Sequence, residues 1–232
     1  MVFAAGLGTR MRPITNHIPK PLVEIGGRTM LDHMLDRLAE GGVTRAIVNV
    51  HHLADQIETH LKGRTRPEIV ISDEREKLLD QGGGIRKALP LIGDADFFIC
   101  NTDAVWLEGP HSTIAAMREA WRPAEMDILL LVAATSGSVG VDWPGDFHMA
   151  PGGRLTRRAE REVSAFVYAG VGIMRASLFA DAQEDVFRLA PYFFRAAEAG
   201  RLHGLRLNGQ WLHVGTPEAV EEAERAYARP AA

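Results

Sequence analysis

Cysteine and long apolar runs are both scarce in this sequence of 232 residues. Cys100 is the only cysteine, so no disulfide can form within the chain. No apolar run approaches the roughly 18–20 residues that a membrane-spanning helix requires. No basic segment precedes the apolar start at Met1, as it would in a secretory signal peptide. These absences predict a protein of the reducing cytoplasm with no membrane partner.

An excess of positive charge is also missing. Lys and Arg number 26 against 30 Asp and Glu, which gives a net charge of −4 with His neutral. Proteins that follow a nucleic-acid backbone usually carry a basic excess, so this balance argues against nucleic acid as a partner. Small phosphorylated substrates need only a local group of basic residues and stay compatible with it. No repeat and no linker interrupts the chain, so we expect one domain over residues 1–232.

Strand-like and helix-like segments alternate over the first half of the chain. We predict strands at residues 1–4, 46–50, 68–72, 97–100 and 126–133, and helices at residues 30–39, 53–61, 84–91 and 113–121. This alternation predicts a mostly parallel sheet with helices on both faces. The first strand is short for a core strand, which favours a natural start a few residues upstream of Met1.

The segments become shorter after about residue 145. We predict antiparallel strands at residues 147–149, 154–156 and 165–174, helices at residues 177–180, 191–199 and 217–228, and a late strand at residues 202–207. The expected fold class is therefore α/β. It is a single-domain, Rossmann-like, mostly parallel mixed sheet flanked by helices, with a small antiparallel subregion.

A glycine-rich run, Ala5-Gly6-Leu7-Gly8-Thr9-Arg10, follows the first predicted strand. In open α/β sheets, ligands bind beyond the carboxyl ends of the strands. Gly6 and Gly8 lack a Cβ, so their backbone N–H groups can come close to phosphate oxygens. We expect the following residues to bind a nucleotide, together with the cationic side chain of Arg10: Ala5, Gly6, Gly8 and Thr9. The alternative is a plain glycine turn, since the run is neither a Walker loop nor a dinucleotide fingerprint.

Lys20 and Asp103 join Arg10 of this loop as the candidate catalytic side chains. Lys20 stands between Pro19 and Pro21, whose rings stiffen the backbone that presents the ammonium group. Asp103 follows the strand predicted at residues 97–100. A carboxylate at the carboxyl end of a strand is a suitable ligand for Mg²⁺. The alternative for Asp103 is a residue that caps a turn.

A second glycine-rich segment, Gln81-Gly82-Gly83-Gly84, is predicted where a loop joins a helix. Glycines there would let a flat base pack closely, and a helix N-terminus exposes free N–H donors. Gln81 can both donate and accept hydrogen bonds, as the edge of uracil requires. We therefore expect Gln81, Gly82 and Gly83 to contact the nucleotide. The alternative is an ordinary helix N-cap turn.

The order of these residues resembles the signature of the sugar-nucleotide pyrophosphorylases. The resemblance rests on Ala5-Gly6-Leu7-Gly8-Thr9-Arg10-Met11-Arg12-Pro13 and Pro19-Lys20-Pro21-Leu22, and it extends nearly to the end of the chain. It implies a GT-A-like fold and metal-dependent transfer of a nucleotidyl group from a nucleoside triphosphate to a sugar 1-phosphate, with release of pyrophosphate. It also implies that the loop wraps the triphosphate and that segment 81–84 contacts the base and ribose. Arg10 and Lys20 would contact phosphates, and Asp103 would bind Mg²⁺.

One motif departs from this family at residue 213. The family usually carries an aspartate in a Trp-x-Asp-x-Gly-Thr motif as a second metal ligand, whereas this chain reads Trp211-Leu212-His213-Val214-Gly215-Thr216. Mg²⁺ prefers oxygen ligands and imidazole suits softer ions, so His213 makes Mn²⁺ an alternative to Mg²⁺. Three interpretations stay open: His213 binds the metal directly, holds a metal-bound water or a phosphate oxygen, or is structural.

The resemblance also bears on the substrates. Segments 81–90, 145–147 and 189–191 are most similar to the short N-acetylmuramate 1-phosphate uridylyltransferases of cell-wall (peptidoglycan) recycling. This similarity implies UTP and N-acetylmuramate 1-phosphate as substrates. Mannose or heptose 1-phosphate guanylyltransferases are the alternatives within the class. The alternative of another class is a non-catalytic regulatory paralogue that binds a nucleotide sugar.

The sugar is expected on the C-terminal side of the domain. Residues 1–135 would form the nucleotide-binding half, and residues 136–232 the sugar-phosphate-binding half with its antiparallel subregion. Asp146 would hydrogen-bond a sugar hydroxyl or, alternatively, cap a turn. Gly170 lacks a Cβ and would let the backbone approach the sugar. The sequence is compatible with a monomer and with a dimer.

Overall fold

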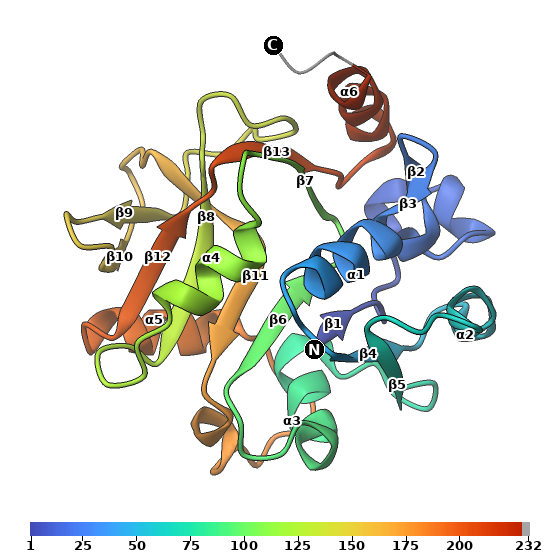
Figure 1. Ribbon diagram of the computed structural model, residues 1–232, viewed down its shortest axis with the longest axis horizontal. Coiled ribbons are helices and arrows are strands. Elements are labelled where there is room, and N and C mark those ends of the chain that lie inside the picture. The colour runs from blue at the N-terminus through green and yellow to red at the C-terminus, as the bar shows by residue number, and fades with distance from the viewer. Residues whose placement is uncertain (229–232) are drawn as a thin grey trace.

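The computed structural model describes residues 1–228, and a mixed nine-stranded sheet forms its centre (Figure 1). The main path of the sheet is β10-β9-β11-β6-β1-β4-β5, with β8 paired to β11 and β12 paired to β8. The bounds are β1 Val2–Phe3, β4 Arg45–Val50, β5 Glu68–Asp73, β6 Phe97–Asn101, β8 Ile128–Ala134, β9 Phe147–Met149, β10 Leu155–Arg157, β11 Phe166–Met174 and β12 Leu202–Arg206. The pairs β6–β1, β1–β4 and β4–β5 are parallel, and β11 is antiparallel to β6.

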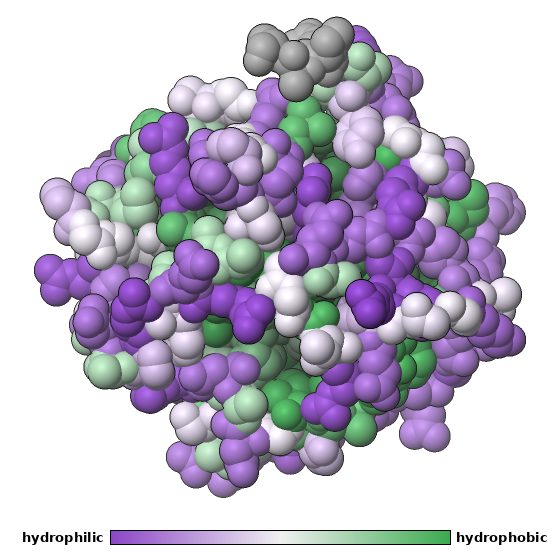
Figure 2. All heavy atoms as spheres, in the orientation of Figure 1, coloured by the Kyte–Doolittle hydropathy of each residue, from purple (hydrophilic) through white to green (hydrophobic). Residues whose placement is uncertain are grey.

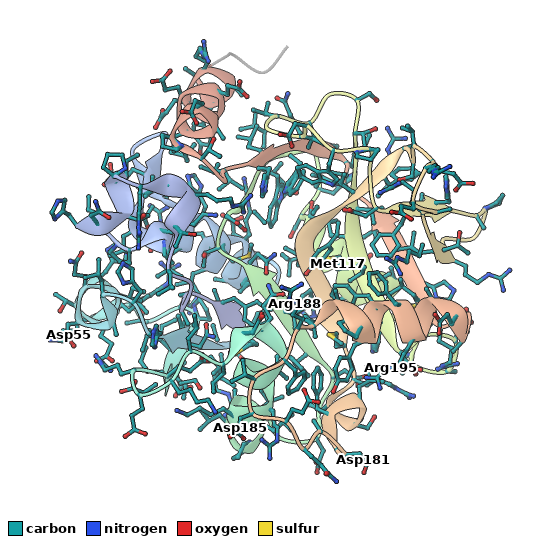
Figure 3. All side chains as sticks on the ribbon, turned by 180° about the vertical axis from the view of Figure 1, so that it is seen from behind. Asp55, Met117, Asp181, Asp185, Arg188 and Arg195 are labelled. Atoms are coloured by element: carbon teal, nitrogen blue, oxygen red, sulfur yellow. The ribbon has the colours of Figure 1, made fainter. Side chains whose placement is uncertain are left out.

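Helices cover both faces of this sheet. Their bounds are α1 Met30–Glu40, α2 Ala54–Leu61, α3 Asp80–Ile92, α4 Thr113–Ala120, α5 Ala190–Glu198 and α6 Pro217–Tyr227. The core on one face includes Leu35 of α1 and Ile114 of α4. The core on the other face includes Ile85 of α3 and Phe193 of α5. Figure 1 shows α1 and α4 in front of the sheet, and Figure 3, seen from behind, shows α5 on the opposite face.

Local sequence explains where several helices begin. The Thr29 side chain accepts a hydrogen bond of 3.1 Å from the Asp32 N–H at the start of α1. Ser112 and Thr216 cap α4 and α6 in the same way. Such caps satisfy backbone donors that have no partner inside the helix. The buried apolar residues of α1 recur at helical spacing, which fixes its inner face: Met30, Leu31, Met34, Leu35 and Leu38.

Two small antiparallel sheets accompany the main sheet. β7 Ala104–Glu108 pairs with β13 Gly209–His213, and β2 Glu24–Ile25 pairs with β3 Arg28–Thr29. In the first pair, His213 lies opposite Ala104, the residue after Asp103. A third group of buried apolar residues packs Met11, at the end of the glycine loop, near Leu212 of β13. Chain segments far apart in sequence therefore meet beside the glycine loop.

The predicted α/β class, with its mixed and mostly parallel central sheet, is confirmed. The predicted antiparallel subregion is present as β9, β10 and β11. Helix α3 begins at Asp80 rather than at residue 84, so the three glycines lie inside the helix and not before it. The helix expected at residues 177–180 is a short 3₁₀ turn, Ala176–Phe179. Strands β7 and β13 were not predicted.

None of the helices over residues 1–228 is long and apolar enough to cross a membrane. On the face shown in Figure 2, hydrophilic and apolar residues are intermixed. Cys100 is buried in β6.

Candidate active site

A cleft of about 550 Å³ lies beyond the carboxyl ends of β1, β4 and β6. This volume is in the range of small-molecule binding sites. The parallel strands end at the same edge, which is where an open α/β sheet binds its ligands. Residues from the glycine loop, the strand ends and the start of α3 line the cleft: Ala5, Gly6, Gly8, Thr9, Arg10, Lys20, Gln81, Asn101 and Asp103.

The glycine loop has a backbone shape that Gly8 makes possible. Gly8 has a φ of +62°, a left-handed conformation that glycine adopts without strain. A Cβ at this position would lie 2.8 Å from Cγ2 of Thr15, whose hydroxyl donates to the Gly8 carbonyl at 2.7 Å. A Cβ at Gly6 would have no neighbour within 4 Å, so the space over Gly6 is open. The structure thus brings the predicted residues Ala5, Gly6, Gly8 and Thr9 to one wall of the cleft.

Lys20 and Asp103 form an ion pair inside the cleft. The Lys20 Nζ donates to the Asp103 Oδ2 at 2.6 Å, and both side chains are mostly buried. Burial alone would raise the pKa of the Asp103 carboxyl. The charge and hydrogen bond of Lys20 act in the opposite direction and, with His213 and Arg10, bring the pKa below its usual value. Asp103 is therefore an ionised carboxylate at neutral pH.

His213 lies beside the cleft, in the lining of a smaller hollow that shares Arg10 and Gly215 with it. Strand pairing sets it opposite Ala104, and its ring lies 5.3 Å from the rings of both Trp143 and Trp211. Burial lowers the pKa of the His213 imidazole, and the charge of Asp103 opposes this effect without cancelling it. A neutral imidazole keeps one nitrogen free to accept a hydrogen bond or to bind a metal.

Asp103 and His213 are the two side chains that the sequence predicts as metal ligands. Residues 1–228 contain no group of three or more His, Cys, Asp or Glu that could hold a metal by itself. One carboxylate and one imidazole fit an ion whose other positions are taken by phosphate and water oxygens. Lys20 already occupies Oδ2 of Asp103, which leaves Oδ1 as the accessible carboxylate oxygen.

The start of α3 differs from the prediction in one respect. Gln81 lines the cleft, and its Nε2 donates to the Asn101 Oδ1 at 2.8 Å. Gly82 and Gly83 do not line it, because their N–H groups donate to the Phe187 carbonyl at 3.0 and 3.4 Å. A Cβ on either glycine would overlap the segment 185–187, which lies beside α3 at Asp185 in Figure 3. These two glycines pack the helix against that segment.

The two predicted sugar ligands also occupy structural positions. The Asp146 carboxylate accepts from the Trp143 Nε1 at 3.2 Å and from the Tyr168 N–H at 2.9 Å. Of the two predicted roles, the geometry matches the one in which Asp146 fixes a turn. Gly170 is buried with a φ of +82°, and a Cβ there would lie 2.6 Å from that of Ala104. Gly170 lets β11 pass close to the turn after β6, and it faces protein atoms instead of a cleft.

A smaller hollow of about 370 Å³ adjoins the cleft and shares Arg10 and Gly215 with it. Gly215 keeps the junction open, since a Cβ there would lie 2.9 Å from His213 Nε2 and 3.4 Å from Arg10 Nη1. Trp143 and Asp142 also line this hollow. It lies on the side of the cleft to which the C-terminal half contributes.

Three buried polar residues of the cleft were not predicted: Asn49, Glu74 and Thr102. Asn49 interrupts the apolar run of β4, and Thr102 stands directly before Asp103, so both gave a signal in the sequence. Glu74 gave none, because a charged residue just after a strand is usually exposed.

A family model described as "MobA-like NTP transferase domain" matches residues 1–210. The chain belongs to this family. The resemblance seen in the glycine loop and around Lys20 is thereby confirmed, and this NTP transferase is an enzyme of the nucleotidyltransferase class. Nucleotidyltransferases of this family generally use a divalent metal ion.

Two curated relatives cover almost the whole NTP transferase. The N-acetylmuramate alpha-1-phosphate uridylyltransferase of Caulobacter vibrioides is 44% identical over 228 residues, which are 97% of this chain and 94% of that protein. The protein of the same name from Neisseria meningitidis serogroup B is 31% identical, over 97% and 96%. The solved structure of HddC from Yersinia pseudotuberculosis complexed with GMP-PN has a TM-score of 0.74 at 20% identity and covers 97% of both chains. That structural likeness concerns the fold alone.

Proposed function

We propose that this NTP transferase joins UTP to N-acetylmuramate 1-phosphate, giving the UDP-sugar and pyrophosphate. The observation that carries the proposal is the 44% identity to the Caulobacter vibrioides uridylyltransferase over 97% of this chain. The cleft supports it, because cationic Arg10 and Lys20 stand beside a glycine loop with open space above it. We also propose that the substrates are small molecules and that the enzyme acts in the cytoplasm, without nucleic-acid or membrane partners. A monomer and a dimer both remain compatible with this proposal.

The residues of the cleft suit an in-line transfer. An oxygen of the sugar 1-phosphate attacks the α-phosphorus of UTP, the bond to the β-phosphate oxygen breaks, and pyrophosphate leaves. The acceptor phosphate is already an anion, so no enzyme base or nucleophile is required. The protein has to hold anionic groups in line and to offset their repulsion. Arg10 and Lys20 supply fixed positive charge for this purpose.

A divalent metal ion, Mg²⁺ or Mn²⁺, would supply charge neutralisation and orientation of the phosphates when bound. Asp103 would hold it through its free carboxylate oxygen, and His213 would hold the metal or one of its water or phosphate ligands. The pairing of β7 with β13 supports this proposal, since it sets His213 opposite the residue after Asp103. Lys20 would then exchange part of its contact with Asp103 for a phosphate oxygen.

The two halves of the domain would bind different substrates. Residues 1–135 would bind the nucleotide, since they supply nearly all of the cleft lining. Residues 136–232 would bind the sugar phosphate. They contribute Trp143 and His213 to the lining of the smaller hollow beside Arg10, which supports an acceptor position there.

A matrix of substrates tests this function. UTP, GTP, CTP and ATP are each combined with the 1-phosphates of N-acetylmuramate, glucose, mannose and heptose, and pyrophosphate release is followed with Mg²⁺ and with Mn²⁺. We expect the highest kcat/KM for UTP with N-acetylmuramate 1-phosphate. A preference for GTP with mannose or heptose 1-phosphate would replace the proposal by a guanylyltransferase. Nucleotide-sugar binding without pyrophosphate release in any combination would indicate a non-catalytic binding protein.

A further inference from the structure

The glycine loop leaves the sheet at a point where side chains take over the backbone hydrogen bonding. β1 ends at Phe3, and the next residue is outside the strand. The Ala4 N–H donates to the Asn49 Oδ1 at 2.8 Å, and the Thr102 hydroxyl donates to the Phe3 carbonyl at 3.0 Å. Asn49 comes from β4 and Thr102 follows β6, the two neighbours of β1. The start of the loop is therefore held from both sides.

Glu74 holds the side chain of Asn49 in place through a further hydrogen bond. The Asn49 Nδ2 donates to the Glu74 Oε1 at 2.8 Å, and the Glu74 side chain is fully buried. A carboxylate only accepts hydrogen bonds, so it turns the NH₂ of Asn49 toward itself and the amide oxygen toward Ala4. Gly84 of α3 makes room, because a Cβ there would lie 2.8 Å from Oε1.

Burying the carboxyl group of Glu74 lowers the stability of the fold, because the charged form loses its hydration. Burial raises the pKa of Glu74, and the hydrogen bond from Asn49 opposes only part of that effect. An apolar side chain would pack without this cost. Glu74 Oε2 has no hydrogen-bond partner among the described residues, so Oε1 is the oxygen that fixes Asn49. A buried polar group fixes one arrangement of the chain through the atoms that are hydrogen-bonded. Here the arrangement that it fixes is the first residue of the glycine loop.

We propose that Asn49, Glu74 and Thr102 are positioning residues that hold the glycine loop in its binding shape before the nucleoside triphosphate arrives. The inference rests on the proposed function, in which backbone N–H groups of this loop bind the triphosphate. A loop that is already ordered loses less conformational entropy on binding, so the three residues strengthen nucleotide binding without touching the nucleotide.

Four variants and one matched control separate positioning from general stability. Asn49→Leu, Glu74→Leu and Thr102→Val remove each hydrogen bond with little change in size, and Glu74→Gln keeps a carbonyl acceptor for Asn49. Thr113→Val is the control. Thr113, at the start of α4, is 5% exposed like Thr102, and its hydroxyl donates a hydrogen bond to the Glu108 carboxylate, away from the glycine loop. The melting temperature of every variant is recorded.

Hydrogen exchange of the free protein gives the first readout, and it does not require activity. We expect residues 4–12 to exchange about 2- to 10-fold faster in Asn49→Leu, Glu74→Leu and Thr102→Val, as the loss of one hydrogen bond implies. Thr113→Val leaves the exchange of this loop unchanged. Glu74→Gln stays close to the native protein. Equal exchange in Glu74→Gln and Glu74→Leu would overturn the orienting role of Glu74, and unchanged exchange in all three variants would overturn the proposal.

Steady-state kinetics give the second readout. We expect KM for the nucleoside triphosphate to rise about 2- to 10-fold, while KM for the sugar 1-phosphate stays constant. A rise of both KM values that follows the fall in melting temperature, and that Thr113→Val shares, would show a merely structural role and overturn the proposal. If the loop loosens as expected but no protein, the native one included, releases pyrophosphate, the proposed function fails and the positioning role stands.

Discussion

At the scale of single residues, the pair of Lys20 and Asp103 concentrates opposite charges where the phosphates would react. Each side chain neutralises the other at 2.6 Å, so neither is left as an unpaired buried charge. The same contact keeps Asp103 ionised, which is the charge state that the proposed metal ligand requires. Loss of either partner would affect both charge balance and substrate orientation.

We expect Lys20→Ala and Asp103→Ala each to lower kcat/KM by about 10²–10³-fold, the usual loss when one well-placed charged group is removed. Pyrophosphate release from UTP and N-acetylmuramate 1-phosphate measures the change. Asp55→Ala is the control, since Asp55 is 95% exposed, pairs with Arg75 and lies at the edge of the molecule in Figure 3. A near-native rate in either cleft variant would refute the role given to that residue.

His213 allows a test of metal preference at one position. His213→Asp introduces the carboxylate that the related signature carries there, and Mg²⁺ prefers oxygen ligands. We expect the ratio of the rate with Mg²⁺ to the rate with Mn²⁺ to rise by about tenfold, at the lower end of what changes around a metal produce. Rates measured over a titration of each metal give this ratio. An unchanged ratio would assign His213 a structural role against Trp143 and Trp211.

At the scale of elements, the close packing of α3 against the segment 185–187 requires two residues without a side chain. Both backbones meet where Gly82 and Gly83 leave no Cβ between them. The ion pair of Arg86 with Asp185, at 2.7 Å, adds a side-chain contact to the same junction. Val186 of this segment lines the cleft, so the junction also shapes the nucleotide site.

Gly83→Ala should therefore separate the segment from the helix. A Cβ at residue 83 would overlap the Asp185 carbonyl oxygen, which is backbone and cannot rotate away. We expect the free energy of unfolding to fall by about 1–3 kcal/mol, as overpacking commonly causes. Urea unfolding measures this change. Gly6→Ala is the control for stability, since its Cβ would meet nothing within 4 Å, and equal losses in both variants would argue against the overlap.

The same elements show what the sequence could predict. The apolar spacing of α1 and the strand ends near the glycine loop and Asp103 are local patterns, so the fold class and the glycine-loop wall of the cleft followed from them. The packing of Gly82 and Gly83 against residues 185–187 could not be predicted, because their neighbour Phe187 is far away in the sequence and no local pattern points to it. Asp146 was undecided for the same reason, since its partners became visible only in the folded chain.

At the scale of the whole molecule, stability depends on pH through carboxyl groups whose pKa differs between the folded and unfolded chains. Burial raises the pKa of Glu74 above its usual value of 4.5. Between that value and the raised one, the folded chain holds more protons than the unfolded chain. The contribution of Glu74 is thus complete at low pH, and stability falls as the pH rises through this window.

Glu74→Gln removes this titration. We expect the free energy of unfolding of the variant, minus that of the native protein, to increase as the pH rises from about 4.5 toward neutrality. Urea unfolding at a series of pH values gives both terms. A difference that stays level or decreases over this range would mean that the carboxyl of Glu74 is ionised as easily in the folded chain as in the unfolded one.

The pairing of β7 with β13 has a consequence for how the enzyme is made. Protein synthesis delivers the N-terminal segments first. A nascent chain that has reached residue 200 already contains the glycine loop, Lys20 and Asp103, yet β7 still lacks its partner strand and His213 does not exist. The β7–β13 pair, and with it the position of His213 opposite Ala104, can therefore form only after synthesis has passed residue 213, long after the glycine loop and Asp103 have been made.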